Sequence, residues 1–438
     1  MTSLRKYIIT LIFFLVLFLA CSPSTDTKKN SEKWVCTWAT SQQLDEVTFP
    51  DINLPPNFKM PEQGPPPKPG EIGNNPSIFY IPADLKDRTV RMVVRNSIGG
   101  SKIRVNLSSS LGSSPVRVGA AHIAVYNPDG SIVPETDHEI TFNSKPVCTL
   151  LPGVLLLSDP VDMDVPPFTN LAVSLYFPEE TGSPAEHRLG LHTTYISKGN
   201  TAGQEIMPNA EKTYAYLWLA GIDVLTEADN FSIAALGDSI TDGFATTLDA
   251  NKAWPMLLAK RLSDTSGTKQ ISVINQGISG NQVLRDGVGI SALARFDRDV
   301  LSIAGVKWVI LLEGINDINF RGWDESPDGL TSDDLIGGYR QIIERAHTHG
   351  IKVVGATLTP EEGVPTMTER GEKIRQTVNE WIRTSGAFDA VVDFDAIIRD
   401  PSRPIRMRPE FDPGDHIHPN DAGNQAMADV FDPNLFRN

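Results

Sequence analysis

The sequence predicts an α/β fold for the C-terminal half of the chain, preceded by an all-β sandwich. From residue 230 onward, continuous apolar runs alternate with amphipathic helical patterns, which is typical of a parallel sheet between helix layers. Between residues 76 and 225, short β-type runs are instead broken by Gly, Pro, Asn and Asp, which favours an antiparallel sandwich or jelly roll. A chain of 438 residues is also too long for one ordinary core. We therefore predict two domains, at residues 34–228 and 229–438.

Five parallel strands are expected in the C-terminal domain. In chain order they are FSIAALG (231–237), ISVINQG (271–277), VKWVILLEG (306–314), IKVVGATL (351–358) and AVVDFD (390–395). Each is a short apolar run, as expected for a strand that helices cover on both faces. Helices are expected at residues 251–262, 333–350, 369–386 and 420–431, where apolar residues recur at helical spacing.

The N-terminal domain is expected to consist of short strands joined by turns. The clearest runs are RTVRMVVRNS (88–97), SKIRVNLSSS (101–110), VRVGAAHIAVY (116–126), DHEITF (137–142) and NLAVSLYF (170–177). Turn chemistry such as NPDG (127–130) separates them. The segment from Phe49 to Gly70 contains eight prolines, so we expect an extended loop there rather than a helix or a central strand.

The first 20 residues have the pattern of an export signal. Arg5 and Lys6 precede an apolar run over residues 8–19, which is too short for a comfortable membrane span. The following Ala20–Cys21 pair resembles a bacterial lipobox, in which the lipidated cysteine becomes the first residue of the cleaved protein. We therefore expect a lipoprotein-type signal at residues 1–20, lipidation at Cys21 and a tether over 21–33, with the protein anchored on a membrane face or the cell surface. A plain signal peptide, which would give a secreted protein, is the alternative.

Charge and cysteine content narrow the class of protein. The formal net charge is −15, and no basic run follows the N-terminus, which argues against nucleic acid and against a membrane contact other than a lipid anchor. Cys36 and Cys148 would remain after lipidation, and the sequence leaves open whether they pair. No Cys-x-x-Cys pattern is present, so a thiolate zinc site is not expected, nor is a cofactor or other metal.

Five candidate catalytic residues follow four of the expected strands. Ser239 follows the first strand, Gly280 the second and Asn316 the third, while Asp415 and His418 lie between the fifth strand and the last helix. Because the carboxyl ends of parallel strands meet at one edge of a sheet, we expect these five residues to lie close together.

Their residue types are those that acyl transfer requires. Ser239 is the candidate nucleophile, and it needs a base, for which His418 is the candidate. Asp415, three residues before His418, can hold the imidazole and stabilise its charged form. The backbone amides of Ser239 and Gly280, with the side-chain amide of Asn316, can donate hydrogen bonds to the oxyanion.

Four blocks in this order, GDSITDG (237–243), GISGN (277–281), GIND (314–317) and DHIH (415–418), resemble the SGNH hydrolases, also called GDSL esterases. The resemblance implies a flavodoxin-like three-layer fold, a Ser239–His418–Asp415 triad and an oxyanion hole made by Ser239, Gly280 and Asn316. N-terminal blocks such as VRMVVRNSIGGSKIRVNLS are similar to a secreted bacterial branch with an N-terminal β-sandwich. That branch is assigned as carbohydrate acetylesterases or arylesterases. The implied substrates are acetylated plant-type polysaccharides or oligosaccharides.

Other interpretations stay open at this stage. Ser-x-x-Asp, from Ser239 to Asp242, is also the pattern of a helix N-cap. Asp412, Asp415, His416 and His418 have the donor types of a metal site, although no remote group completes a ligand set. The chain could also be an arylesterase or lipase-like carboxylesterase on other esters, or a non-catalytic carbohydrate-binding surface protein. For the sandwich we favour a structural role over a carbohydrate-binding one.

Overall fold

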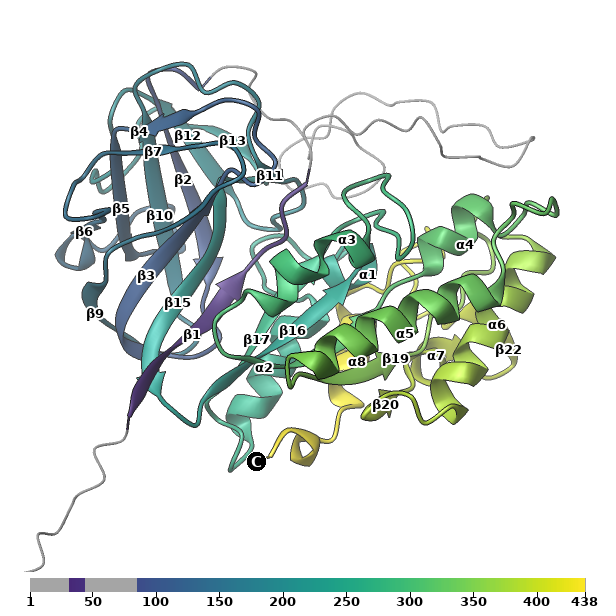
Figure 1. Ribbon diagram of the computed structural model, residues 1–438. Helices are drawn as coiled ribbons and strands as arrows, with labels where there is room; N and C mark the ends of the chain where they lie inside the picture. The colour runs from purple at the N-terminus through teal and green to yellow at the C-terminus, as the bar shows by residue number, and fades with distance from the viewer. Residues whose placement is uncertain (1–30, 44–84, 438) are drawn as a thin grey trace, which may run out of the picture. The chain divides into compact units, whose positions relative to one another are not determined.

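The computed structural model describes residues 31–43 and 85–437 (Figure 1). The predicted signal, Cys21, most of the predicted tether and the proline-rich segment lie outside the described residues. Within the described ranges, no helix combines the length and the apolar character that a membrane span needs.

The C-terminal α/β region (residues 231–437) contains the five predicted strands in one parallel sheet. They are β16 (Phe231–Gly237), β17 (Ile271–Gly277), β18 (Val306–Leu312), β19 (Lys352–Ala356) and β20 (Ala390–Val392). The spatial order is β17-β16-β18-β19-β20, so the strands follow the order 2-1-3-4-5 along the chain. This is the order of flavodoxin-like folds, and it confirms the predicted fold class. The chain reverses its winding direction at β16, the strand that precedes Ser239.

Helices cover this sheet, and the four long ones fall where the sequence predicts them. They are α2 (Trp254–Asp264), α5 (Ser332–Thr348), α6 (Glu369–Thr384) and α8 (Asp421–Asp429). In Figure 1, α5 passes in front of the sheet, next to α6, whereas α8 lies behind it. The N-terminus of α5 is fixed by a capping box, in which Thr331 and Asp334 exchange side-chain and backbone hydrogen bonds. The one-turn helix α1 (Ser239–Asp242) lies at the Ser-x-x-Asp pattern that indicated a helix start. Short helical segments that the sequence did not predict are α3 (Ala292–Phe296), α4 (Ile315–Arg321) and α7 (Phe394–Ile398), with a π-helical turn at Asp297–Leu301.

The N-terminal β region (residues 32–227) is built of antiparallel sheets, as predicted. One sheet has the order β1-β15-β3-β8, and β9 also pairs with β3; the other has the order β13-β12-β2-β10-β5-β6. The strands of the first are β1 (Glu32–Ala39), β3 (Gly100–Ser108), β8 (Leu155–Leu157), β9 (Val161–Val165) and β15 (Leu219–Glu227). Those of the second are β2 (Arg88–Arg95), β5 (Ala120–Val125), β6 (His138–Glu139), β10 (Asn170–Phe177), β12 (Thr194–Lys198) and β13 (Glu211–Thr213). Buried residues of both sheets share one apolar core, which is the packing of a sandwich.

Smaller elements complete the two regions. Two-stranded sheets pair β4 (Val116–Val118) with β7 (Cys148–Leu150), β11 (Glu186–His187) with β14 (Tyr216–Leu217), and β21 (Arg399–Asp400) with β22 (Arg403–Met407). The expected run 116–126 is therefore two strands, β4 and β5, which separate at Gly119 and join different sheets. Cys36 and Cys148 are both free thiols, so they do not form a disulfide.

Strand β1 belongs to the sandwich but also packs on the α/β region. Val35 lies in the core of the sandwich, whereas Cys36 and Ala39 lie in the core of the parallel sheet. The amide of Cys36 donates to the carbonyl of Ala304 at 2.9 Å, and Ser232 Oγ donates to the Cys36 carbonyl at 2.7 Å. Residues Glu32–Asn438 form one compact unit. The division at residues 228 and 229 falls in the turn between β15 and β16 and stays a prediction.

Candidate active site

Ser239 is the first residue of the one-turn helix α1, directly after β16. The N-cap of this helix is Asp238, whose Oδ1 accepts a hydrogen bond from the amide of Ile240 at 3.0 Å. Interpreting Ser239 as the capping side chain is therefore wrong by one position, because Asp238 already satisfies the free amide. The Ser239 hydroxyl is consequently not used in capping. The helix ends at Gly243 in the left-handed conformation, with φ 107°.

His418 and Asp415 lie on the loop before α8, and they complete a continuous hydrogen-bond series with Ser239. Nε2 of His418 is 2.8 Å from Ser239 Oγ, and Nδ1 of His418 is 2.7 Å from Asp415 Oδ2. With Nδ1–H donating to the carboxylate, Nε2 is free to accept the serine proton. The structure thus brings together three residues that are distant in sequence, in an arrangement that can activate a hydroxyl.

Asp415 is held as a carboxylate by its surroundings. Its Oδ1 accepts hydrogen bonds from the amides of Ile417 at 3.1 Å and His418 at 3.0 Å. Burial alone would raise the pKa of Asp415, but the hydrogen bonds and the nearby imidazole lower this pKa below its ordinary value. A charged Asp415 can fix the tautomer of His418 and stabilise the imidazolium.

Gly280 and Asn316 lie in loops that follow the neighbouring strands β17 and β18. Gly280 has φ +80°, and a Cβ added there would be 2.8 Å from Cβ of Val288, so the position requires glycine. Nδ2 of Asn316 donates to the carbonyl of Asn281 at 3.0 Å, which leaves its second hydrogen available. Within the described residues, the backbone amides of Ser239 and Gly280 donate to no protein acceptor. These groups can therefore donate to an anionic oxygen.

Three buried carboxyl groups lie beneath the turn that carries Ser239. Burial raises the pKa of Asp238 to about 7 and that of Asp317 to about 7, and it raises the pKa of Glu313 well above its ordinary value. Negative charge under the turn would oppose an oxyanion that forms above it. Partial or full protonation of these groups near neutral pH reduces that opposition.

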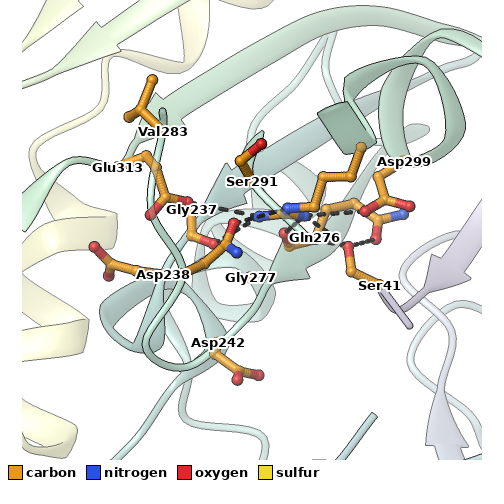
Figure 2. Close-up of polar contacts among 12 residues, drawn as sticks. Ser41, Gly237, Asp238, Asp242, Gln276, Gly277, Val283, Ser291, Asp299 and Glu313 are labelled. Carbon is orange, nitrogen blue, oxygen red and sulfur yellow. Dashed lines mark hydrogen bonds and ion pairs between the residues drawn. The ribbon is translucent and has the colours of Figure 1, made fainter. Parts of the chain in front are cut away.

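A fully buried arginine supports the same turn from below. Arg295 donates from Nη2 to the Gly237 carbonyl at 3.0 Å, and from Nη1 to the Gln276 carbonyl at 2.7 Å and to Ser41 Oγ at 2.9 Å. Its Nη1 also lies 3.1 Å from Asp299 Oδ2. Figure 2 shows how these contacts connect Gly237, Gln276, Ser41 and Asp299. The backbone before Ser239 is therefore tied to two elements of the α/β region and to the segment after β1.

His416 forms a second Asp–His pair beside the first. Its Nδ1 is 2.6 Å from Asp412 Oδ2, while Asp415 contacts His418 instead. The four residues that the sequence left as a possible metal-ligand set are thus arranged as two separate pairs. In the described part of the chain, no group of three or more His, Cys, Asp or Glu residues is arranged to hold a metal ion.

The sequence interpretation missed the role of Asp242, the last residue of α1. Its Oδ2 accepts hydrogen bonds from the Ser279 amide at 3.0 Å and from Ser279 Oγ at 2.8 Å, and its Oδ1 is 3.0 Å from Nε2 of His187. In the sequence, Asp242 is recognisable only as part of a possible capping pattern. Its connection to the loop of Gly280 depends on packing that no local pattern encodes.

Comparison with protein families and solved structures gives the following likenesses. Residues 235–426 match the GDSL-like Lipase/Acylhydrolase family. No curated protein matches the chain significantly. An acetylxylan esterase from Geobacillus stearothermophilus is 21% identical, with 48% of this chain and 95% of that chain covered and a TM-score of 0.36. A GDSL-like lipase from Bacteroides thetaiotaomicron is 19% identical to this chain. The match covers 47% of this chain and 87% of that chain, with a TM-score of 0.34. A psychrotrophic esterase from Pseudoalteromonas sp. is 18% identical to this chain. The match covers 46% of this chain and 94% of that chain, with a TM-score of 0.34.

Proposed function

We propose that the chain is a serine esterase for short acyl groups, acetyl above all; the match of residues 235–426 to the GDSL-like Lipase/Acylhydrolase family supports an ester hydrolase. The proposed substrates are acetylated plant-type polysaccharides or their oligosaccharides. The observation that carries the serine mechanism is the hydrogen-bond series from Ser239 through His418 to Asp415, with distances of 2.8 and 2.7 Å.

In the proposed mechanism, Ser239 Oγ attacks the ester carbonyl while Nε2 of His418 takes its proton. Asp415 stabilises the imidazolium that forms. The amides of Ser239 and Gly280, with Nδ2 of Asn316, donate to the oxyanion of the tetrahedral intermediate. His418 then returns the proton to the leaving alcohol, which gives an acyl-enzyme. Water then attacks the acyl group while Nε2 of His418 takes a proton from the water, and His418 returns this proton to Ser239 Oγ as the bond between the acyl group and the serine breaks and the carboxylic acid leaves.

The choice of substrate class rests on the N-terminal β region and on the export signal. The blocks of the sandwich resemble those of secreted enzymes that act on plant polysaccharides. An exported enzyme meets such polymers directly, whereas a cytoplasmic one does not. No cofactor is needed for this chemistry, because serine, histidine and backbone donors supply every group that the reaction uses.

A substrate panel tests the proposal. We expect acetate release from acetylated xylan or a related polymer. We also expect kcat/KM for 4-nitrophenyl esters to fall at least about tenfold from acetate to octanoate, because a short-acyl site gains no binding energy from a longer chain. The Ser239→Ala variant is the blank. A clear preference for long acyl chains would move the function to a lipase, and polysaccharide binding without turnover would favour a non-catalytic role.

We further propose that the protein is exported and held at a membrane by a lipid on Cys21. The support is the apolar run at residues 8–19 with Ala20 and Cys21 after it. A Cys21→Ser variant is expected to move from the membrane fraction to the soluble fraction of the producing cell, because a single cysteine carries the lipid. Retention of this variant in the membrane fraction would contradict lipid anchoring.

A further inference from the structure

A buried histidine of the N-terminal β region contacts the nucleophile helix of the α/β region. His187 is in β11, and Asp242 is the last residue of α1, which begins at Ser239. Nε2 of His187 lies 3.0 Å from Asp242 Oδ1, and the two side chains are 4% and 3% exposed. Neither group can therefore exchange this contact for water without local opening of the structure.

The partners of His187 determine its protonation. Nδ1 lies 2.8 Å from the Ser41 carbonyl oxygen, and Nε2 faces the Leu189 carbonyl oxygen at 3.2 Å as well as Asp242. A carbonyl oxygen can only accept, so both ring nitrogens must carry a proton to satisfy these contacts. The other oxygen of Asp242 accepts two hydrogen bonds from Ser279, as a carboxylate does. The geometry is that of a buried imidazolium–carboxylate pair.

The same carboxylate holds the loop that carries Gly280. Ser279 directly precedes Gly280, and both the amide and the hydroxyl of Ser279 donate to Asp242 Oδ2. The orientation of the next peptide, whose N–H belongs to Gly280, depends on where this anchor lies. A shift of about 1 Å in a group that stabilises a transition state can lower the rate by about a hundredfold.

We propose that His187 is a positioning residue for ester hydrolysis: its imidazolium holds the Asp242 carboxylate, which fixes Ser279 and thereby the amide of Gly280 in the oxyanion hole. This inference rests on the proposed serine mechanism. It assigns to the N-terminal β region a part in the active site, through one side chain that acts on the loop of Gly280.

The strength of the His187–Asp242 ion pair depends on pH, because His187 can lose its proton. Burial alone would lower the pKa of His187, but Asp242 and the two carbonyl groups raise this pKa above its ordinary value. The ion pair therefore contributes its full stability below the unfolded-state pKa, and the contribution is lost as the pH rises through the raised pKa of the folded state. The Tyr216 ring stacks 6.3 Å from the imidazole. The cavity beside the pair is also lined by the charged or titratable residues Arg95, His192 and Lys252.

Two substitutions in the full chain separate the hydrogen bond from the charge. His187→Gln keeps an N–H near the place of Nε2 without a charge, whereas the shorter His187→Asn cannot reach Asp242. We expect kcat for 4-nitrophenyl acetate to fall about 10- to 100-fold in His187→Asn, with KM within about twofold. Because His187 loses its charge as the pH rises through its raised pKa, we expect the activity of the wild type to decline at alkaline pH. We expect His187→Gln to retain kcat within about fivefold and to lack this decline.

His192→Asn is the matched control, because His192 is also a buried histidine that contacts an aspartate, Asp249, at 3.3 Å, and Asp249, whose side chain is 51% exposed, does not lead to the loop of Gly280. Its kcat is expected to stay within about twofold of the wild type. The rate at which an organophosphonate modifies Ser239, followed by mass spectrometry, should fall in parallel with kcat in His187→Asn. That rate does not depend on which ester the enzyme uses in nature.

Two results would overturn the proposal. One is a folded His187→Asn variant with wild-type kcat and phosphonate reactivity, and the other is an equal loss in His187→Asn and His192→Asn, which would indicate general destabilisation. If His187→Asn does not fold, His187→Gln is the test. The proposal is also overturned if the activity of His187→Gln declines at alkaline pH as the activity of the wild type does. A wild-type protein that reacts with the phosphonate but releases no acetate from polysaccharides would defeat only the proposed substrate.

Discussion

The Ser239→Ala variant is expected to hydrolyse 4-nitrophenyl acetate with a kcat/KM about 10⁵-fold below that of the wild type. Loss of a nucleophile removes the covalent pathway altogether and leaves only what binding and the oxyanion hole contribute. The fold should be unaffected, because Asp238 rather than Ser239 caps α1, and among residues 31–43 and 85–437 the hydroxyl forms a hydrogen bond only with His418. Steady-state kinetics and thermal unfolding of the purified variant measure the two effects separately.

Ser402→Ala is a suitable control for this variant. Ser402 lies in the exposed turn between β21 and β22, where its hydroxyl donates to Asp400. Its kcat/KM should equal that of the wild type. More than a few per cent of wild-type activity in Ser239→Ala, with no contaminating esterase, would refute the nucleophile assignment.

The Arg295→Met variant should show the largest loss of stability, about 3–5 kcal/mol in the free energy of unfolding. Arg295 is 1% exposed, and its guanidinium contacts Asp299, Glu313 and Asn281 besides the carbonyls of Gly237 and Gln276. Methionine fills a similar volume but removes the buried positive charge and every hydrogen bond that the guanidinium donates to these buried acceptors. Denaturant titration, followed by circular dichroism, gives the difference.

Substitution of an exposed arginine, Arg261, is the control for Arg295→Met. Arg261 pairs with Asp429 at 3.3 Å, with side chains that are 36% and 52% exposed, so Arg261→Met should cost less than about 1 kcal/mol. If Arg295→Met is too unstable to purify, Arg295→Lys should show an intermediate loss, because lysine keeps the charge but not the forked donors. Equal stabilities of Arg295→Met and Arg261→Met would show that the buried contacts contribute little.

The parallel sheet could be predicted because its signal is local and long. Runs such as FSIAALG and ISVINQG are mainly apolar and lack the regular polar alternation of a strand with one exposed face, and both are strands with the predicted bounds. Ser-x-x-Asp indicated a helix start at Ser239, but the length of α1 could not be predicted, because four residues are fewer than the pattern of apolar positions needs to show a period. Its cap was assigned one residue late for a related reason, since Asp238 and Ser239 are both common capping residues and only the backbone conformation distinguishes them.

The juxtaposition of Ser239, Asp415 and His418 followed from the strand order, because the ends of parallel strands share one edge. No local sequence pattern predicts the contact of His187 with Asp242. Fifty-five residues separate the two, and they meet only because the sandwich packs on the α/β region. The neighbours His192 and Asp249 show that residue type alone does not distinguish a connection to the catalytic loop from one that ends elsewhere.

Strand β1 has a consequence for the order in which the chain can fold. Its Cys36 carbonyl accepts from Ser232, which is 196 positions later, and Arg298 donates to the carbonyl of Gln42, which is 256 positions earlier. Synthesis delivers the first strand long before either partner exists, and its neighbour β15 in the sandwich also emerges about 190 residues later, so the apolar side chains of β1 stay uncovered during that time. A helper that shields this strand in the meantime is expected to raise the yield of active protein.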